Sequence, residues 1–589
     1  MAGTKPMHGS HGEAPYVGPL GQLLRLLRPD LTDIVVVGIF SLVVGLLSLA
    51  TPITVEALVN TVTFGRYLQP LVVLAIMLFA FLGFAALLKG LQTYIAEIMQ
   101  RRVFVRVVMQ LAEKLPRVKR DAFAEQHGPE MINRFFEVIT VQKSAALLVL
   151  DGIAIVITAI IGMIVLAFYH PYLLGFDLVL MGSVAFAVFA LGRGAVDTAI
   201  NESYKKYAVA SWLEQLAMFP TTFKLDGGRQ RARERADELT VDYLKARQNH
   251  FAILIRQIIF SLALQAVAGA SLLGIGGFLV INGQLTLGQL VAAELIVAVI
   301  VGSFAKLGKH MESYYDLLAA CDKLGHLFDL PTERDEGVNP QRLSLGARVA
   351  LHRVTLQGGH HGATAPHASN PLSLVIEPGE RVAISGPPGS GKSHLLEMLY
   401  ALDDPAHGYI EFDALDLRSV SPAALREQVA LVQSIEVFEG TVAENIDLGR
   451  AGINYEDVRQ VLEDLDLWNE VMHLPEGLQT KLSPTGNPLS GSQLIRLALA
   501  RALVSKPRLM MVDTILDQLA DHQLRRVLDA LTSADRSRTL IIVSGRDGLL
   551  SSCDRAIHLG PDFHSDGTSP EEDPTSSGTK NRLGLVSVR

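Results

Sequence analysis

The sequence predicts a multi-domain protein, in which an all-α transmembrane domain of six helices precedes an α/β P-loop nucleotide-binding domain. Two observations support this fold class: long apolar stretches occupy residues 31–315, and a glycine-rich pattern follows a short apolar segment that begins at Arg381. The chain has 589 residues, more than one hydrophobic core usually holds. Its 49% of hydrophobic residues against 19% of charged ones is high for a wholly soluble protein.

Six apolar stretches are long enough, with their flanks, to cross the hydrocarbon core of a bilayer, which takes about 20 residues. They begin at Ile34, Leu71, Ile153, Tyr172, Ile258 and Leu290. Two of them contain a carboxylate, Asp177 in the fourth and Glu294 in the sixth. Charge inside hydrocarbon usually faces a cavity or a partner, so a part for Glu294 in a substrate pathway stays open.

The connections between these stretches alternate in length and charge. Those after spans one, three and five are short, whereas those after spans two and four are long and rich in Lys and Arg. Because cationic loops stay in the cytoplasm, both long loops and both termini are expected there. Helical periodicity continues into the long loops and is interrupted by RVKRDAFAEQHGPE and AMFPTTFKLDGG, which we expect to form distal turns of helices that project beyond the bilayer.

A phosphate-binding loop is predicted where a short apolar strand runs into the pattern G-x-x-x-x-G-K-S and then into a helix. Glycines let backbone N–H groups converge on phosphate oxygens, and the start of the helix adds a favourable dipole. Lys392 would reach the outer phosphates and Ser393 would offer its hydroxyl to Mg²⁺. The residues expected to bind nucleotide are Gly386, Pro387, Pro388, Gly389, Ser390, Gly391, Lys392 and Ser393.

An aspartate follows a second apolar segment, PRLMMVDT, about 120 residues beyond the phosphate loop. This segment predicts a buried strand that delivers Asp513 to the Mg²⁺ site. A strand that ends in aspartate is common, so the inference depends on the preceding phosphate loop.

The segment NPLSGSQLIRLALARAL resembles the signature motif of ATP-binding-cassette (ABC) transporters, leucine-serine-glycine-glycine-glutamine. Leu489, Ser490, Gly491 and Gln493 match it, and Ser492 replaces a glycine. Six spans with long loops, the phosphate loop, Gln433 in LVQSIEVFEGTVAENI, the signature and the aspartate strand follow one another in the family's order. Over roughly residues 20–560 the chain resembles a half-transporter of the type I ABC exporter kind.

This resemblance implies ATP and Mg²⁺ as cofactors, with Ser393, Gln433 and Asp513 at the metal. It also implies a dimer, in which the signature, Leu489, Ser490, Gly491, Ser492 and Gln493, closes over ATP bound by a second half-transporter. The two distal turns would act as coupling helices, and YVGPLGQLLRLLRPDLTD would be an amphipathic elbow helix.

The expected domain organisation has five parts: an N-terminal tail and elbow helix at 1–30, a transmembrane domain at 31–315, a linker at 316–345, an ABC nucleotide-binding domain at 346–560 and a disordered tail at 561–589. The tail is rich in Ser, Asp, Gly and Pro, which is typical of disorder. His360, His361 and His367 lie in a glycine-rich loop, and their spacing matches no metal-ligand pattern.

Several positions depart from the family's pattern. Thr514 stands where the family has the glutamate that activates the attacking water, and Gly545 stands where it has a histidine at the γ-phosphate. No aromatic residue precedes the phosphate loop at the adenine position, and Ala520, beside Asp521, replaces an aspartate that crosses to the partner. None of the family's catalytic residues is therefore intact, and a degenerate site that binds Mg-ATP but hydrolyses it poorly is predicted.

The predicted function is an ATP-driven ABC exporter subunit, with a heterodimer favoured over a homodimer. Two alternatives stay open: an ATP-binding regulatory or receptor-like membrane protein, and a homodimeric exporter with an unorthodox hydrolysis. We expect a multi-pass protein of a bacterial inner (plasma) membrane, with an exported substrate of unknown class and a periplasmic adaptor as a further partner to consider. The net charge of −8 gives no support for nucleic-acid binding.

Overall fold

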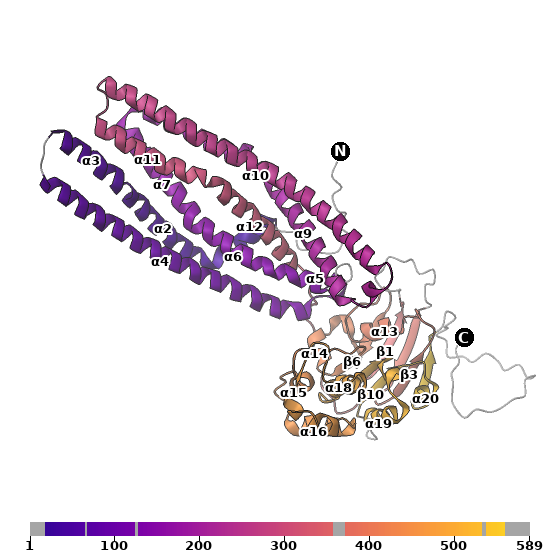
Figure 1. The fold of residues 1–589 in the computed structure, drawn as a ribbon. Coiled ribbons are helices and arrows are strands. Elements are labelled where there is room, and N and C mark those ends of the chain that lie inside the picture. Colours follow the sequence, from indigo (N-terminus) through magenta and orange to yellow (C-terminus); the bar gives the residue numbers. More distant parts are fainter. Residues whose placement is uncertain (1–17, 65–67, 124–127, 357–370, 533–536, 560–589) are drawn as a thin grey trace, which may run out of the picture. The chain divides into compact units, whose positions relative to one another are not determined.

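The computed structural model describes residues 18–64, 68–123, 128–356, 371–532 and 537–559. The chain forms two compact units, one of Met1–Val118 with Glu125–Pro331 and the other of Lys119–Ala124 with Thr332–Arg589 (Figure 1). The tail expected to be disordered and the three histidines at 360, 361 and 367 lie outside the described residues.

The first unit is all-helical, as predicted, and its long helices run side by side (Figure 1). Its main helices are α1 (Pro19–Leu27), α2 (Leu31–Ser48), α3 (Ala50–Phe64), α4 (Leu68–Lys114), α5 (Gly128–Asn133), α6 (Glu137–Leu147), α7 (Ile153–Tyr169), α8 (Pro171–Ala185), α9 (Ala195–Met218), α10 (Gly228–Ile281), α11 (Leu287–Ala305) and α12 (Leu307–Phe328). Two short π-helical segments, Leu148–Gly152 and Phe186–Ala190, interrupt this pattern.

Helices long and apolar enough to cross a membrane account for five of the six predicted spans. The sixth span corresponds to a shorter apolar helix, Leu287–Gly302. Asp177, on α8, is 3% exposed, and neither of its carboxylate oxygens has a hydrogen-bond partner within the described part of the chain. One oxygen of Glu294, on α11, is likewise buried and without such a partner there.

Two helices extend well beyond a bilayer's hydrocarbon thickness. The 54 residues of α10 span about 80 Å at 1.5 Å each, against about 30 Å of hydrocarbon. The helices end near both predicted distal turns, since α4 stops at Lys114 and α9 at Met218. Gly227 precedes α10 as its N-cap with φ +77°, a left-handed conformation that glycine adopts without a steric cost.

The predicted elbow helix corresponds to α1. Leu23 and Leu26 are buried, whereas Leu20 and Leu24 are exposed on another face. The side chain of Gln22 donates to Asp329 at the end of α12, with 2.8 Å between the two atoms. This helix is therefore amphipathic and is fixed to the last helix of the same unit.

The second unit is α/β and contains two main sheets. A parallel sheet has the strand order β11-β3-β10-β9-β6, and an antiparallel sheet has the order β2-β1-β4-β5. The strands are β1 (Val349–Val354), β2 (Leu372–Ile376), β3 (Arg381–Ser385), β4 (Tyr409–Phe412), β5 (Leu415–Asp416), β6 (Val429–Val432), β9 (Leu509–Asp513), β10 (Thr539–Val543) and β11 (Arg555–His558). The strands β7 (Gly440–Thr441) and β8 (Lys481–Leu482) form a separate two-stranded sheet.

Apolar residues explain the central position of β9 and β10, because every residue of both strands is buried. Helices pack against the sheet; those that matter for the site are α13 (Lys392–Leu399), α18 (Gly491–Leu503) and α19 (Asp521–Leu531). Parallel strands place their carboxyl ends at one edge of the sheet, and ligands of such sheets bind there. The predicted phosphate loop follows β3 at this edge, and Asp513 is the last residue of β9 there.

Candidate nucleotide-binding site

The phosphate loop joins β3 to α13, as the sequence predicts. Gly389 and Gly391 have φ values of +81° and +86°, which non-glycine residues rarely adopt. The ammonium of Lys392 donates to the carbonyls of Gly386 and Pro387, each at 2.8 Å, and to the Ser390 hydroxyl at 3.2 Å. Lys392 therefore lies within the curve of the loop. Burial lowers its pKa, and the nearby Asp513 carboxylate opposes this.

The structure places Asp513 beside Ser393. Asp513 ends β9 and is 5% exposed, and the Ser393 side chain is hydrogen-bonded to its carboxylate. Burial raises the pKa of Asp513, while the Ser393 hydrogen bond and the Lys392 charge work against that rise. The Oδ1 atom of Asp513 is buried and has no partner among the described residues.

These atoms fit a magnesium ion. Mg²⁺ takes hard oxygen ligands, and a carboxylate oxygen without a partner next to a serine hydroxyl supplies two of them. The pKa of Asp513 is raised by burial, so a cation at Oδ1 would favour its ionised form.

Gln433 follows β6, and its side-chain nitrogen lies 3.4 Å from Oε1 of Glu397 on α13. The same Glu397 forms an ion pair with Arg120, which belongs to the segment Lys119–Ala124 of this unit. Sequence reasoning missed Glu397 and the role of Arg120. The signal was available for Glu397, because it lies four residues after Ser393 and so on the same side of α13.

The two positions of the family's catalytic groups carry no acid or base. Thr514 is exposed and has φ +53°, an unusual conformation for a β-branched residue, and its backbone N–H donates to Val543 at 2.9 Å. Gly545 is exposed, and its backbone N–H lies 3.3 Å from Oδ2 of Asp517. The other oxygen of Asp517 accepts from the Ser544 hydroxyl at 2.6 Å.

Asp517 is therefore a carboxylate close to Gly545 that the sequence analysis did not identify. Both of its carboxylate oxygens accept hydrogen bonds from the turn after β10, so this side chain stabilises that turn. Its place in TILDQ, four residues after Asp513, is the only sequence signal for it.

The turn after this segment also differs from the family's pattern. Ala520 precedes α19 as its N-cap, and Asp521 accepts from Arg546 at 3.1 Å within the same unit. Asp521 therefore already has a cationic partner in its own chain.

The signature segment forms the start of α18. Ser490 is the N-cap, and its backbone N–H donates to Oε1 of Gln493 at 2.6 Å. The Gln493 amide nitrogen in turn donates to Glu470 at 2.6 Å. Ser490 and Gly491 are exposed, and a Cβ added at Gly491 would meet nothing within 4 Å.

Leu489, which precedes the N-cap, is buried and anchors the segment, and Ser492 is partly buried. Gln493 thus serves to hold the helix start, whose open N–H groups form an anion-binding surface.

Comparisons with known proteins agree with this architecture. Residues 34–304 match the family model of the ABC transporter transmembrane region, and residues 369–516 match the family model described as ABC transporter. The two matched segments together take in more than half of the chain. This chain belongs to the ABC transporter family. The ABC transporter fold is that of a half-transporter of the exporter type, with one membrane region followed by one ATP-binding region.

The solved structure of a bacterial Atm1-family ABC exporter with ATP bound is similar to this ABC transporter, with a TM-score of 0.77 and 20% identity over 91% of this chain and 94% of the other. Relatives include the transport/processing ATP-binding protein ComA of Streptococcus pneumoniae, 23% identical over 88% of this chain and 72% of that protein. The mycobactin import protein IrtB of Mycolicibacterium smegmatis is 27% identical over 78% of this chain and 79% of its own. The cyclolysin secretion/processing protein CyaB of Bordetella pertussis is 24% identical over 88% and 72%.

Proposed function

We propose that this ABC transporter subunit binds Mg-ATP and hydrolyses it poorly, and that it works as the degenerate half of a heterodimeric exporter. One observation supports the proposal: Lys392 lies within the phosphate loop and Ser393 lies beside Asp513, while Thr514 and Gly545 provide no base. A missing general base commonly costs about 10² to 10⁴ in rate.

In this proposal the phosphate loop and Lys392 hold the phosphates, and Ser393, Gln433 and Asp513 hold the metal. Mg²⁺ supplies charge neutralisation on the phosphates when bound. Thr514 has a hydroxyl that can orient a water molecule, but it cannot accept that water's proton at neutral pH.

A heterodimer, unlike a homodimer, would contain one ATP site with a catalytic base. Two copies of this chain would form two ATP sites, and both would lack the base. A partner with an intact glutamate and histidine would leave one efficient site, to which this chain would lend the helix start at Ser490 and Gly491. Ser490 and Gly491 are exposed, which supports a contact between this helix start and the partner's ATP. Ser492, in place of a glycine, is the one residue of this segment that departs from the family's signature.

Export from the cytoplasm is supported by the fold and by secretion proteins among the relatives, although one relative is named as an importer. We propose a bacterial inner-membrane location with both termini in the cytoplasm, on the charge of the two long loops. A protein, lipid or small-molecule cargo and a periplasmic adaptor all stay compatible with this function.

The purified full chain in lipid nanodiscs tests the proposal. It should bind radiolabelled ATP with Mg²⁺ and show turnover near background, and Lys392→Ala should weaken binding at least tenfold. Turnover by the lone chain at about 1 s⁻¹ or faster, abolished by Lys392→Ala, would contradict it.

A further inference from the structure

Three side chains with metal-binding atoms, one imidazole and two carboxylates, lie together in the nucleotide-binding unit. They are His394, Glu397 and Asp403; each offers one ligand atom, and these atoms all lie within 4.8 Å of one another. The three side chains are 13–19% exposed, so the group is largely shielded but still reached by solvent. None of the three belongs to the proposed phosphate and magnesium sites.

The helix α13 and the turn after it bring these side chains together. His394 and Glu397 are three residues apart on α13, and residues at this spacing lie on one face of a helix. The backbone N–H of Leu402 donates to the Glu397 carbonyl at 2.9 Å, which folds the chain back over the end of the helix. Asp403 follows directly, and its carboxylate lies 3.6 Å from the His394 ring nitrogen Nδ1.

A buried arginine holds the turn that precedes Asp403. The guanidinium of Arg426 donates to the carbonyls of Tyr400, at 3.3 Å, and Ala401, at 3.0 Å. Arg426 is itself fixed by two hydrogen bonds to the Glu333 carboxylate, at 2.5 and 2.8 Å. The backbone beside Asp403 is therefore held at the end of α13 by the protein alone.

The carboxylate of Glu397 is oriented through one of its two oxygens. Oε1 forms the ion pair with Arg120 and lies 3.4 Å from the side-chain nitrogen of Gln433. Oε2 is the oxygen that lies towards His394, 3.7 Å from its Nδ1. Carboxylates that bind metals are commonly held by such contacts with neighbouring groups.

The separations between the ligand atoms fit a metal site better than direct hydrogen bonds. Nδ1 of His394 lies 3.7 Å from Glu397 and 3.6 Å from Asp403, beyond the limit of about 3.2 Å for an N–H···O hydrogen bond. Zinc binds imidazole nitrogen and carboxylate oxygen at about 2.0–2.2 Å, which places two ligands of a tetrahedral ion about 3.4 Å apart. A small rotation of the carboxylates would therefore close the three atoms around one ion.

The ligand types favour a transition metal. An imidazole combined with carboxylates suits zinc and related divalent ions, whereas Mg²⁺ and Ca²⁺ prefer ligand sets made of oxygen. Three protein ligands leave one position of a tetrahedral zinc ion for water. The partial exposure of the three side chains gives both the ion and the water a path to this position.

We propose that Nδ1 of His394, Oε2 of Glu397 and Oδ2 of Asp403 bind a divalent transition-metal ion of the zinc type, with water as the fourth ligand. The ion joins α13 to the turn that follows it. Because an ion that binds only the folded chain stabilises it, zinc stabilises the nucleotide-binding unit. The site needs neither ATP nor transport.

Zinc binding to the full chain in nanodiscs, without nucleotide and without a histidine tag, tests the proposal. Competition with a fluorescent zinc chelator measures affinity and stoichiometry. The parent chain for these measurements has serine in place of five other histidines, so that they do not contribute: His8, His11, His360, His361 and His367. It should bind one zinc ion per chain, at least about 100-fold more tightly than Mg²⁺.

Two variants of the parent chain each remove one ligand with little change in size. His394→Gln and Asp403→Asn should each weaken zinc binding at least tenfold. His473→Gln is the matched control, because His473 is an exposed histidine of the same unit whose Nδ1 bonds to the Asn469 carbonyl at 2.6 Å. Its zinc affinity should stay within twofold of the parent. The Tm of each variant in EDTA shows that it is folded.

X-ray absorption at the zinc edge adds a readout on the parent chain that does not depend on any variant. The spectrum should show one imidazole among nitrogen and oxygen ligands and no sulfur. A spectrum with sulfur or without imidazole would overturn the proposal. Undiminished zinc affinity in folded His394→Gln and Asp403→Asn, or equal affinity for zinc and Mg²⁺, would also overturn it. No nucleotide is present, so the proposed function can fail while this site is confirmed.

Discussion

At the scale of single residues, the proposed loss of catalysis depends on Thr514 and Gly545, which carry no acid or base. Thr514 occupies a left-handed backbone conformation, and its side chain is exposed. Such a conformation costs a β-branched residue more than an unbranched one. Space and backbone geometry therefore both permit a longer side chain at this position.

Restoring the acid–base groups should restore turnover. In the isolated chain, Thr514→Glu combined with Gly545→His should raise ATP turnover at least tenfold over the unaltered chain, because a base returns beside the attacking water. Phosphate release measures it. Thr514→Gln with Gly545→His is the matched control, since the amide has the same size and no basicity, and it should stay within twofold. Equal rates for the two double variants would show that a missing base is not what limits hydrolysis.

Lys323 on α12 is a buried lysine whose pKa is lowered. It is 1% exposed and lies 3.6 Å from the centre of the Tyr207 ring and 4.0 Å from Glu137. Ser203 on α9 accepts from it. Burial lowers the pKa of Lys323 to about 7, although Glu137 opposes this and Lys206 and Arg134 add to it.

The stability of the helical unit should depend on pH through this lysine. Between pH 7 and about 10 the unfolded chain binds the lysine proton and the folded chain does not, so stability rises with pH. From pH 7 to 9 the free energy of unfolding should increase by up to about 2 kcal/mol relative to Lys323→Met. Tm measured at both pH values checks this. A Tm difference between the two proteins that does not change with pH would exclude the mechanism.

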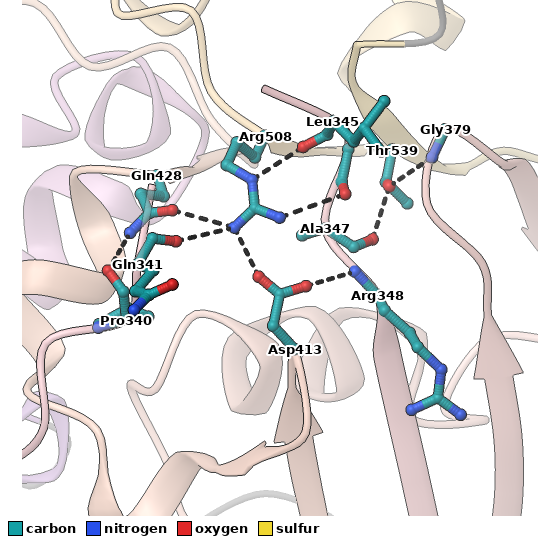
Figure 2. A network of polar contacts seen from close by, with 11 residues as sticks. Pro340, Gln341, Leu345, Ala347, Arg348, Gly379, Asp413, Gln428, Arg508 and Thr539 are labelled. Carbon is teal, nitrogen blue, oxygen red and sulfur yellow. Dashed lines mark hydrogen bonds and ion pairs between the residues drawn. The ribbon is translucent and has the colours of Figure 1, made fainter. Parts of the chain in front are cut away.

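At the scale of elements, one arginine connects the start of β9 to three separate segments (Figure 2). Arg508 is 4% exposed and donates to the carbonyls of Gln341, Leu345 and Gly346. It also pairs with Asp413, at 2.5 Å, and with the Gln428 side chain, at 3.1 Å. The strand that carries Asp513 is thereby fixed at its opposite end.

Arg508→Met should destabilise the nucleotide-binding unit by roughly 3–5 kcal/mol, because it removes a buried guanidinium and leaves the half-buried Asp413 carboxylate and three backbone carbonyls without this donor. Arg418→Met is the matched control: Arg418 pairs with Asp416 at the surface with 54% of its side chain exposed, and little change is expected. Urea unfolding, followed by the loss of ATP binding, compares the two. Similar midpoints would show that the network contributes no more than a surface ion pair.

At the scale of the whole molecule, the loop charges predict the proposed orientation in the membrane. A cysteine at Gln284, in the exposed turn between α10 and α11, should react with an impermeant maleimide added to intact cells. A cysteine at Lys224, in the exposed turn between α9 and α10, should react only after the cells are opened. Both variants are made after Cys321 and Cys553 are replaced by alanine. The reverse pattern would invert the proposed topology.

The sequence by itself determined the fold class, five spans that the structure shows as long apolar helices, the glycine-rich loop after β3 and the position of Asp513 at the end of β9. These features depend on neighbouring residues, such as the length of an apolar stretch or the spacing of glycines in a short motif. Such patterns can be recognised in the sequence without knowing the fold. Only the tertiary structure decided that Glu397 lies beside Gln433 and Arg120, that Asp517 holds the turn at Gly545, and that His310 lies close to Asp151. These residues are far apart in the chain or lie on π-helical segments, and packing, which brings distant side chains together, has no local sequence signal.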